Sequence, residues 1–444
     1  MCLMTKSILI PLNNVSAKGD FCAEVAIGSP PQVQHLIVDT GSSALVVKAT
    51  TFDSKQDLAI APTTFIQHMR YGIGDWIGPI VHSSAQLGHG FYKAQIDAVS
   101  FSIAESIQTG TFANADGMLG LAYRELDHAH NASSILEELN LSYTWPWNDA
   151  LDQRVATRDF VTKLVQQPDK QLVPLFTALE EHQVVANQFA FLVHRSSIFH
   201  SDTCSNPRKL ALHPLNRGFL ALGRPHLHTH LHKPNYQHVK VVHDKYYNVE
   251  LLSLNIKGQA PIPAPTLSDR QLKISGSNAI VDTGASAIVL PEKLFKALFQ
   301  QFKVHNPAFE QPLKSFEEFS GQEQGIPIEN VELDKWPDIE LQLVSEDGTP
   351  TVLTITPHSY WQTHAPQSNQ ISFKLITLPN WGEQAILGLP LLCEYYCIFD
   401  RSRGESGVIS FADKQVAPHR LSDTIHNDIE KLTALFKQHK IHST

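Results

Sequence analysis

Short apolar runs, separated by glycine, proline and asparagine, make up most of this chain. Runs of four to eight residues that are rich in valine, isoleucine and phenylalanine are typical of β-strands. Long stretches with helical periodicity are confined to two regions. The pattern therefore predicts an all-β fold with a few added helices. Segments that illustrate the predicted strands are 21–27, 97–103, 248–256 and 339–344.

The two helical regions are residues 128–172, most clearly 149–167, and residues 416–444. Apolar residues recur there at a spacing close to 3.6, which places them on one face of a helix. Ser422 is a suitable N-cap for the second helix. We expect a helical insertion and a helical C-terminal extension. The apolar positions are Leu151, Val155, Phe160 and Leu164 in the insertion, and Ile425, Ile429, Leu432, Leu435 and Phe436 in the extension.

An internal repeat organises the rest of the chain. The sequence VDTGSS at 38–43 returns as VDTGAS at 281–286, and in both copies apolar runs precede and follow the motif. Further along, GMLGL at 117–121 is echoed by AILGL at 385–389. Glycine after two apolar residues indicates a strand that ends where another backbone comes close. Each half of the chain therefore has an Asp-bearing loop between buried strands, followed later by an apolar-apolar-Gly strand.

Length and composition narrow the functional classes. A chain of 444 residues is too long for one ordinary core, and 42% apolar with 18% charged residues is a globular composition. The net charge of -9 and the lack of a long Lys/Arg run argue against nucleic-acid binding. The sequence contains no run of 18 apolar residues, so no membrane span is predicted. The apolar run 8–12 is shorter than a signal-peptide core, so a cytoplasmic protein is expected if Met1 is the native start.

Two groups of residues raise the alternative of a metal site. The cysteines are odd in number and widely scattered, which suits buried thiols in a reducing compartment better than disulfides or zinc. Four histidines alternate along 226–232, and on a strand they would share one face that could hold a transition metal. A polar connector is the favoured interpretation, so no metal and no cofactor are expected. The residues concerned are Cys2, Cys22, Cys204, Cys393 and Cys397, and His226, His228, His230 and His232.

The paired D-T-G motifs in this context resemble those of the pepsin-like family of aspartic peptidases. The resemblance covers about residues 8–415, from IGSPPQ at 27–32, similar to the family's first hairpin, to YYCIFD at 395–400, similar to its last strands. It implies two pseudo-symmetric lobes with the active cleft between them. We expect an N-terminal lobe at 1–235, a C-terminal lobe at 236–415 and the extension at 416–444.

The resemblance also implies the chemistry. Asp39 and Asp282 would be the catalytic carboxylates, sharing one proton so that one acts as base towards water and the other as acid. Thr40 and Thr283 would cross-brace the two loops, and Ser42 would donate a hydrogen bond to Asp39. An Asx-turn is the alternative for either aspartate alone, but not for the pair. The supporting residues implied are Thr40, Gly41, Ser42, Thr283 and Gly284.

The segment Tyr71-Gly72-Ile73 resembles the tip of the family's flap, a hairpin that covers the bound peptide. An ordinary hairpin is the alternative. Trp76 either covers apolar substrate side chains or packs under the hairpin.

The predicted function is an aspartic endopeptidase that cleaves extended, mainly apolar-flanked peptides, binds pepstatin-like inhibitors and is a monomer. One alternative function is a catalytically dead homologue that binds peptides, proteins or glycans. A second alternative is a specialised processing enzyme instead of a general peptidase.

Three departures from the family pattern refine the expectation. Val46 stands where the family usually has a tryptophan, and Ala285 where it usually has a hydroxyl residue. Asp39 also lies too near Met1 for an inhibitory prosegment, which predicts activity without processing. These features resemble the cytoplasmic bacterial pepsin homologues, the shewasin-like proteins.

Overall fold

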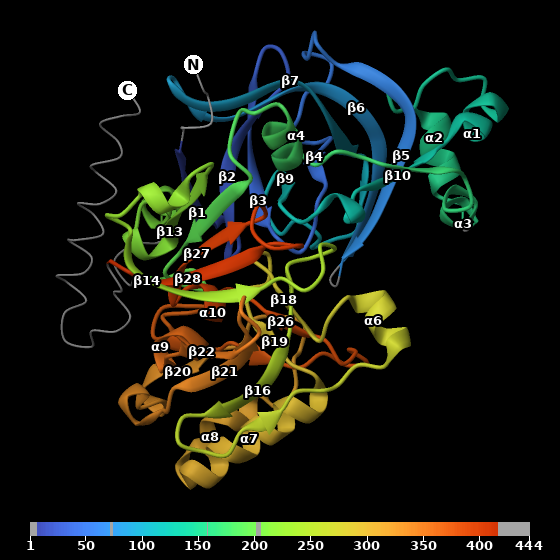
Figure 1. Ribbon diagram of the computed structural model, residues 1–444. Helices are drawn as coiled ribbons and strands as arrows, with labels where there is room; N and C mark the ends of the chain where they lie inside the picture. The colour runs from blue at the N-terminus through green and yellow to red at the C-terminus, as the bar shows by residue number, and fades with distance from the viewer. Residues whose placement is uncertain (1–6, 72–73, 158, 201–205, 416–444) are drawn as a thin grey trace. The chain divides into compact units, whose positions relative to one another are not determined.

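The computed structural model describes residues 7–71, 74–157, 159–200 and 206–415 (Figure 1). The chain divides into two compact units, one formed by Met1–Ile10 and Cys22–Ala186, the other by Pro11–Phe21 and Asn187–Thr444. This division falls earlier in the chain than the lobe boundary at 235/236 expected above. The limits of the functional lobes therefore stay a prediction. The C-terminal helix predicted at 416–444 lies outside the described residues.

The first unit is built on long, mainly antiparallel strands in the order β11-β10-β5-β6-β7-β4-β9-β3-β2. The pairs β3–β9 and β4–β7 are parallel. Buried and partly exposed positions alternate over residues 82–88 of β6, which shows that one face of this part packs against a core, whereas residues 76–81 are all buried. The strands are β2 (Asp20–Ile27), β3 (Gln32–Asp39), β4 (Leu45–Lys48), β5 (Ala61–Tyr71), β6 (Gly74–His89), β7 (Tyr92–Ala104), β8 (Ser106–Ile107), β9 (Gly117–Gly120), β10 (His128–Asn131) and β11 (Asp169–Gln171).

Short helices of the first unit gather mainly in the predicted insertion, where α1, α2 and α3 lie beside β5 and β10 (Figure 1). The helix expected over 149–167 is two helices, because Val155 and Phe160 are five residues apart and do not fit one helical face. The Asn148 side chain accepts from the N–H groups of Ala150 and Leu151 and so begins α2. The helices are α1 (Ser133–Glu138), α2 (Asp149–Val155), α3 (Phe160–Leu164) and α4 (Leu175–Glu181).

The second unit contains several small sheets as well as the strand order β1-β13-β12-β27-β28-β14. The others are β15-β18-β26-β19-β25, β17-β16-β21-β22 and β20-β24-β23. The longer strands are β1 (Ile8–Ala17), β12 (Gln188–Leu192), β13 (Arg217–Leu222), β14 (His232–Lys240), β16 (Leu251–Ile256), β21 (Ile339–Val344), β22 (Pro350–Ile355), β27 (Tyr395–Asp400) and β28 (Val408–Lys414). The shorter strands are β15 (Asn248–Val249), β17 (Ile262–Pro263), β18 (Ala279–Val281), β19 (Ile288–Val289), β20 (Ile326–Pro327), β23 (Trp361–Thr363), β24 (Gln370–Phe373), β25 (Leu375–Ile376) and β26 (Ala385–Leu387).

An amphipathic helix, α7, contributes much of the core in the second unit. Its buried face meets an aromatic cluster in which the rings of Phe309 and Trp336 stack at 3.9 Å and Phe302 lies 5.4 Å from Trp336. Such large aromatic side chains supply most of the buried apolar area. The helices are α5 (Pro207–Ala211), α6 (Asp269–Ser275), α7 (Glu292–His305), α8 (Glu310–Leu313), α9 (Pro357–Tyr360) and α10 (Leu389–Leu392).

The sequence repeat corresponds to a structural repeat. In the first unit, β9 pairs in parallel with β3 and antiparallel with β4. In the second unit, β26 pairs in parallel with β18 and antiparallel with β19. Each apolar-apolar-Gly strand therefore lies between the two strands that flank a D-T-G loop, and both loops join buried strands as predicted.

The strand on which a histidine metal site would depend does not form. Pro225 begins a 3-10 helix, η4 (Pro225–Leu227), which contains His226, and a turn follows it before β14 begins at His232. The histidines therefore do not alternate along one strand. His232 is buried and stacks on Tyr396 at 4.7 Å, as a packed side chain.

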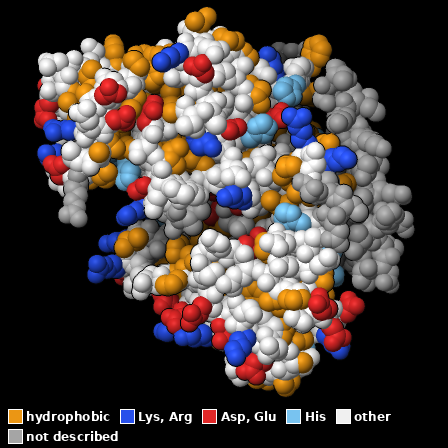
Figure 2. Space-filling model, turned by 180° about the vertical axis from the view of Figure 1, so that it is seen from behind, with side chains coloured by type: hydrophobic (Ala, Val, Ile, Leu, Met, Phe, Trp, Pro, Cys, Tyr) orange, Lys and Arg blue, Asp and Glu red, His pale blue; other side chains and the backbone are white. Residues whose placement is uncertain are grey.

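The surface of the described residues carries both acidic and basic side chains. Acidic and basic side chains are intermixed on the face drawn in Figure 2. Within the described part of the chain, no helix combines the length and apolar character needed to cross a membrane.

Candidate functional site

The first D-T-G loop holds its aspartate by hydrogen bonds from both sides. Asp39 ends β3 and is buried, with 6% of its surface exposed. The Gly41 N–H donates to Asp39 Oδ1 at 2.7 Å, and Ser42 Oγ donates to Oδ2 at 2.5 Å. Donors to both oxygens favour the charged form of a carboxylate. The Ser42 bond is the one that the family resemblance implied.

The second loop repeats the backbone donor of the first. Asp282 directly follows β18 and is partly exposed. The Gly284 N–H donates to Asp282 Oδ1 at 2.8 Å, matching the role of Gly41 in the first unit. Ala285 occupies the position equivalent to Ser42 and has no hydroxyl to donate. The two loops therefore share their backbone donor and differ in the side-chain donor.

Backbone bonds to the neighbouring strand fix each loop. In the first unit the Leu121 N–H donates to Asp39 O at 2.7 Å, and the Ala122 N–H to Ser42 O at 2.8 Å. In the second, the Leu389 N–H donates to Ala285 O at 2.8 Å; the acceptor is equivalent to Ser42, and the donor is equivalent to Leu121. Each bond follows the glycine of an apolar-apolar-Gly strand.

These two glycines leave no room for a side chain. A Cβ on Gly120 would lie 2.4 Å from the carbonyl carbon of Ser43, and one on Gly388 would lie 2.3 Å from the carbonyl oxygens of Ala285 and Ala287. Backbone atoms cannot move aside as a flexible side chain can. The repeated glycine is therefore required so that the D-T-G loop can lie directly against the strand beside it.

The two threonines of the motifs, Thr40 and Thr283, are fully buried. Burial of a hydroxyl is costly unless it has a hydrogen-bond partner. The cross-brace between them remains a prediction from the resemblance.

The hairpin predicted to bear the flap is formed by β5 and β6, whose last register pair is Tyr71 with Gly74. Gly72, Ile73 and the Tyr71 side chain lie outside the described residues. Trp76 is 1% exposed and packs against Phe112 with ring centroids 6.4 Å apart. Of its two predicted roles, packing under the hairpin is therefore the one present here.

A residue that sequence reasoning missed supports this hairpin. Thr111 is buried, and its hydroxyl donates to Gln108 O at 2.7 Å and lies 3.2 Å from Asp75 O. A Cβ on Gly74 would lie 2.2 Å from Thr111 Oγ1, so Gly74 permits the contact. Thr111 and Asp75 are 36 positions apart in the sequence, so local patterns give no clear signal for this contact.

A charged cluster at the start of β3 was also missed. His35 Nδ1 lies 3.3 Å from Asp116 Oδ2, and its Nε2 lies 3.6 Å from Glu24 Oε1. Hydrogen bonds to Asp116 and then Glu24 raise the pKa of His35 to about 9. Asp116 immediately precedes β9, so this ion pair lies where the parallel pairing of β3 with β9 begins, and these two strands lead to Asp39 and Gly120.

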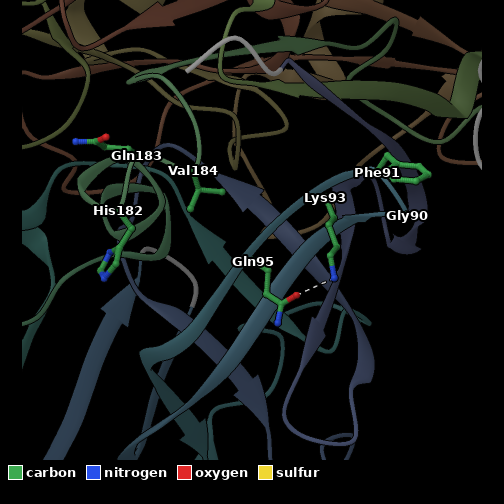
Figure 3. A pocket seen from close by; sticks show the side chains of 7 residues that line it. All are labelled: Gly90, Phe91, Lys93, Gln95, His182, Gln183 and Val184. Carbon is green, nitrogen blue, oxygen red and sulfur yellow. Dashed lines mark hydrogen bonds between the residues drawn. The ribbon is translucent and has the colours of Figure 1, made fainter. Parts of the chain in front are cut away.

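The first unit also has a pocket of about 570 Å³ between the tip of the β6–β7 hairpin and the end of α4 (Figure 3). Phe91 at the tip is 91% exposed, and Lys93 Nζ donates to Gln95 Oε1 at 2.9 Å. None of the lining residues belongs to the candidate site. They are Gly90, Phe91, Lys93, Gln95, His182, Gln183 and Val184.

Comparison with known proteins identifies one family. The sequence pattern of the family described as eukaryotic aspartyl protease matches residues 20–140 and 218–413, which together exceed half of the chain. Both D-T-G motifs and both apolar-apolar-Gly strands lie inside the matched segments. Most of the helical insertion and residues 141–217 as a whole lie outside them.

Relatives of low sequence identity also carry names of aspartic proteases or related proteases. The chain is 21% identical over 403 residues to beta-secretase of Strongylocentrotus purpuratus, covering 86% of this chain and 65% of that protein. It is 22% identical over 422 residues to plasmepsin VI of Plasmodium berghei, covering 88% and 74%. Over 129 residues it is 33% identical to aspartic protease 6 of Caenorhabditis elegans, covering 26% and 33%. The chain thus spans less than two thirds of the sea-urchin and nematode proteins.

Proposed function

Because the chain belongs to the eukaryotic aspartyl protease family, we propose that it is an aspartic endopeptidase with Asp39 and Asp282 as its catalytic carboxylates. The observation that carries the proposal is the matched pair of loops. Each loop presents an aspartate at the end of a buried strand, with a glycine N–H on its Oδ1 atom. An Asx-turn at one isolated aspartate would not repeat the surrounding three-strand arrangement.

The chemistry follows from sharing a proton. Two carboxyls close together cannot both ionise easily, so one stays protonated while the other is charged. The charged member removes a proton from the attacking water, and the protonated member polarises the peptide carbonyl and later supplies the leaving amine with a proton. Hydrogen bonds to Asp39 from Gly41 and Ser42 favour its charged form. Asp39 is therefore suited to be the charged member, which acts as the base.

The substrate is an extended peptide bound as a strand, with pockets for alternate side chains, and mainly apolar residues flank the cleaved bond. Tyr71 and the neighbouring Gly72 and Ile73 cover it in this proposal. Support comes from the β5–β6 hairpin, which is long and continues in register to Tyr71 and Gly74. Peptide or protein substrates and pepstatin-like inhibitors are the expected ligands, and the protein acts as a monomer.

Finer assignments belong to the same proposal. Likeness to the cytoplasmic, shewasin-like bacterial homologues is supported by Val46 and Ala285, which depart from the usual family residues. A reducing compartment is supported by Cys393 and Cys397, which are buried free thiols. Burial raises the pKa of Cys393 to about 11, which keeps the thiol protonated and unreactive. Microscopy of the tagged protein in its native cells would test the location.

The decisive experiment replaces each aspartate separately by its amide. Asp39→Asn and Asp282→Asn preserve shape but remove the charge, so kcat should fall by about 10² to 10⁴-fold or more, as for loss of a general acid or base. Cleavage of a peptide library, with and without pepstatin, gives the measurement. Asp97→Asn is the matched control, because this carboxyl lies exposed on β7 and should leave kcat unchanged.

Two results would overturn the assignment. Substantial cleavage by either purified amide variant would show that the carboxylate pair is not the catalyst. A folded wild-type chain that cleaves no peptide from acidic to neutral pH, yet binds pepstatin, would instead identify a peptide-binding homologue.

A further inference from the structure

The helical insertion is attached to the hairpin that leads to Tyr71. Residues 141–172 of the insertion have no counterpart in the family match. In this chain they lie against β5 and β6, which are inside the match. A segment outside the family match can modify the element on which it packs.

Backbone hydrogen bonds join the insertion to the outer edge of β5. His130 and Asn131 of β10 pair with Ile66 and Phe65. The Ala132 N–H donates to Thr64 O at 2.8 Å. β5 would otherwise present unpaired backbone groups along this edge of the sheet.

A second segment of the insertion binds the same strand. Thr144 is fully buried, its N–H donates to Thr63 O at 2.9 Å, and its hydroxyl lies 2.9 Å from Thr63 O and 3.1 Å from Phe65 O. A buried hydroxyl with two carbonyl oxygens in reach fixes the position of the strand more tightly than backbone pairing alone.

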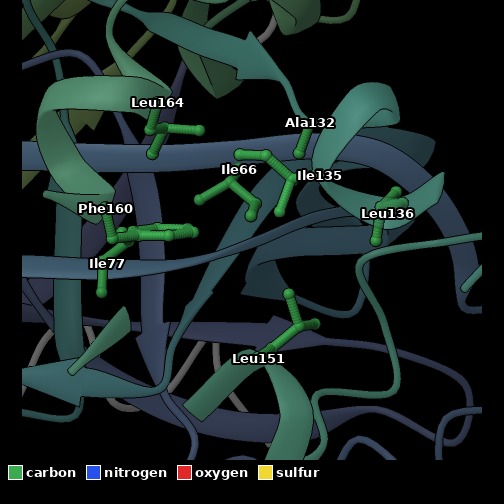
Figure 4. Close-up of a cluster of buried hydrophobic side chains, with 8 residues drawn as sticks. All are labelled: Ile66, Ile77, Ala132, Ile135, Leu136, Leu151, Phe160 and Leu164. Atoms are coloured by element: carbon green, nitrogen blue, oxygen red, sulfur yellow. The ribbon is translucent and has the colours of Figure 1, made fainter. Parts of the chain in front are cut away.

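Apolar side chains complete the attachment (Figure 4). Ile66 of β5 and Ile77 of β6 are buried in one cluster with residues from all three insertion helices. Both strands of the hairpin are therefore held, not only the edge strand. The insertion residues of this cluster are Ala132, Ile135, Leu136, Leu151, Phe160 and Leu164.

Gln67 extends the attachment along β5. This side chain is buried, and its Nε2 donates to Asp127 Oδ1 at 2.8 Å and to His128 O at 3.0 Å. In the register, Gln67 lies opposite Gly78 and His68 opposite Ile77. A Cβ on Gly78 would lie 1.8 Å from Ile103 O, so β7 supports the hairpin at the same level from the other side.

We propose that the insertion is a positioning element for the hairpin: it holds β5 as far as Gln67 and β6 at Ile77, and so fixes the base of the hairpin. The proposal rests on the proposed function, in which this hairpin covers the substrate. A fixed base lowers the entropy lost when the hairpin orders over a peptide, so the insertion lowers KM. Leu164, Thr144 and Gln67 act through the hairpin and are positioning residues.

The test compares two identical substitutions in the first unit. Leu164→Ala removes a buried side chain from the cluster, whereas Leu179→Ala removes an equally buried one from α4, which packs on β7 instead. Hydrogen–deuterium exchange of the full chain measures local opening. We expect amides of β5 and β6 near the cluster to exchange at least about tenfold faster in Leu164→Ala and to change little in Leu179→Ala.

A milder variant guards against loss of folding. Thr144→Val keeps the shape and removes only the hydroxyl, and it should accelerate the same amides by a smaller factor. Kinetics supply the second readout: KM should rise about three- to tenfold in Leu164→Ala while kcat stays within about twofold, the signature of weakened binding without loss of chemistry. Leu179→Ala should alter neither constant beyond the effect of lower stability.

Equal exchange of the hairpin in the Leu164→Ala and Leu179→Ala variants would overturn the proposal, as would a fall in kcat with unchanged KM. The exchange result is independent of catalysis. A wild-type chain without peptidase activity would therefore refute the proposed function while the exchange comparison still decides whether the insertion holds the hairpin.

Discussion

At the scale of single residues, the main asymmetry of the site is Ser42 in one loop and Ala285 in the other. The Ser42 hydroxyl donates to Asp39 Oδ2 at 2.5 Å, and Ala285 cannot donate. A hydrogen bond to the charged form lowers a carboxyl pKa. Ala285→Ser should therefore move the acid limb of the kcat/KM profile to lower pH. The profile reports apparent pKa values of the carboxyl pair, not of Asp282 alone.

The opposite substitution gives the matched comparison. Ser42→Ala removes the corresponding donor from Asp39 and should move the acid limb to higher pH. Serine is preferred to threonine at 285, because the alanine methyl already lies beside Gly388. An acid limb that stays in place in both variants, or moves in the same direction in both, would show that neither hydroxyl sets the pKa.

Gly388 supports a prediction about stability. Its backbone has φ -88, which any residue adopts, so only crowding forbids a side chain. Gly388→Ala should lower the free energy of unfolding by about 1–3 kcal/mol, the usual cost of overpacking, or by more if the loop cannot shift. Urea unfolding measures the change. Gly382→Ala is the control because no atom lies within 4 Å of its added Cβ, and an equal loss there would contradict the argument.

Sequence reasoning succeeded for residues whose neighbours lie nearby in the chain. Asp39, Gly41 and Ser42 form a local turn, so their contacts follow from adjacent positions. The contact between His35 and Asp116 joins residues 81 positions apart, and only the pairing of β3 with β9 brings them together. No periodicity in either segment indicates that partner.

At the scale of elements, apolar spacing predicted strands better than helices. The flanks of both D-T-G motifs form the strands expected, because short runs rich in β-branched residues suit buried strands. The helix predicted over 149–167 is two helices, α2 and α3. The five-residue spacing between Val155 and Phe160 indicates this break, because residues five apart do not share one helical face. The alternating histidines do not share one strand face, because Pro225 begins a 3-10 helix that includes His226.

Glu105, which lies between β7 and β8, predicts an effect of pH on stability. Burial, reinforced by the nearby charge of Asp152, raises the pKa of Glu105 from 4.5 to about 7. The folded chain keeps a proton here that the unfolded chain releases above 4.5. The free energy of unfolding therefore falls as pH rises from 4.5 to about 7. Above that range Glu105 causes no further change with pH.

Glu105→Gln should remove this part of the pH dependence, because the amide cannot ionise. Urea unfolding followed across the same range gives the measurement, and the variant should gain on wild type towards neutral pH. Asp152→Asn should produce a smaller change of the same sign, since its charge is the lesser cause. Parallel curves for wild type and Glu105→Gln would contradict the assignment.

At the scale of the whole molecule, the ion pair at the base of β3 adds an alkaline limit to stability. Asp116 and Glu24 raise the pKa of His35 from 6.5 to about 9. A raised histidine contributes stability that is fully present below 6.5 and is lost as pH rises towards 9. Because Glu105 acts in the same direction at lower pH, we expect the chain to be more stable in mildly acidic than in mildly alkaline solution.

His35→Gln isolates the histidine contribution. The variant should be less stable than wild type below 6.5, and the difference should shrink as pH rises towards 9. Melting temperatures across this range provide the measurement, at low salt because the cluster is half exposed and its attraction is screened. A constant difference across that range would show that His35 acts through packing and not through its charge.

The covered edge of β5 also bears on solubility. β10 and β11, strands of four and three residues, now form the outer edge of this sheet. Strands this short offer little backbone for another chain to pair with, whereas the eleven residues of β5 would offer a long template. An engineered protein lacking residues 128–172 should therefore aggregate by intermolecular strand addition, which light scattering would detect. Lysine substitutions along the exposed strand would be needed to keep such a shortened protein in solution.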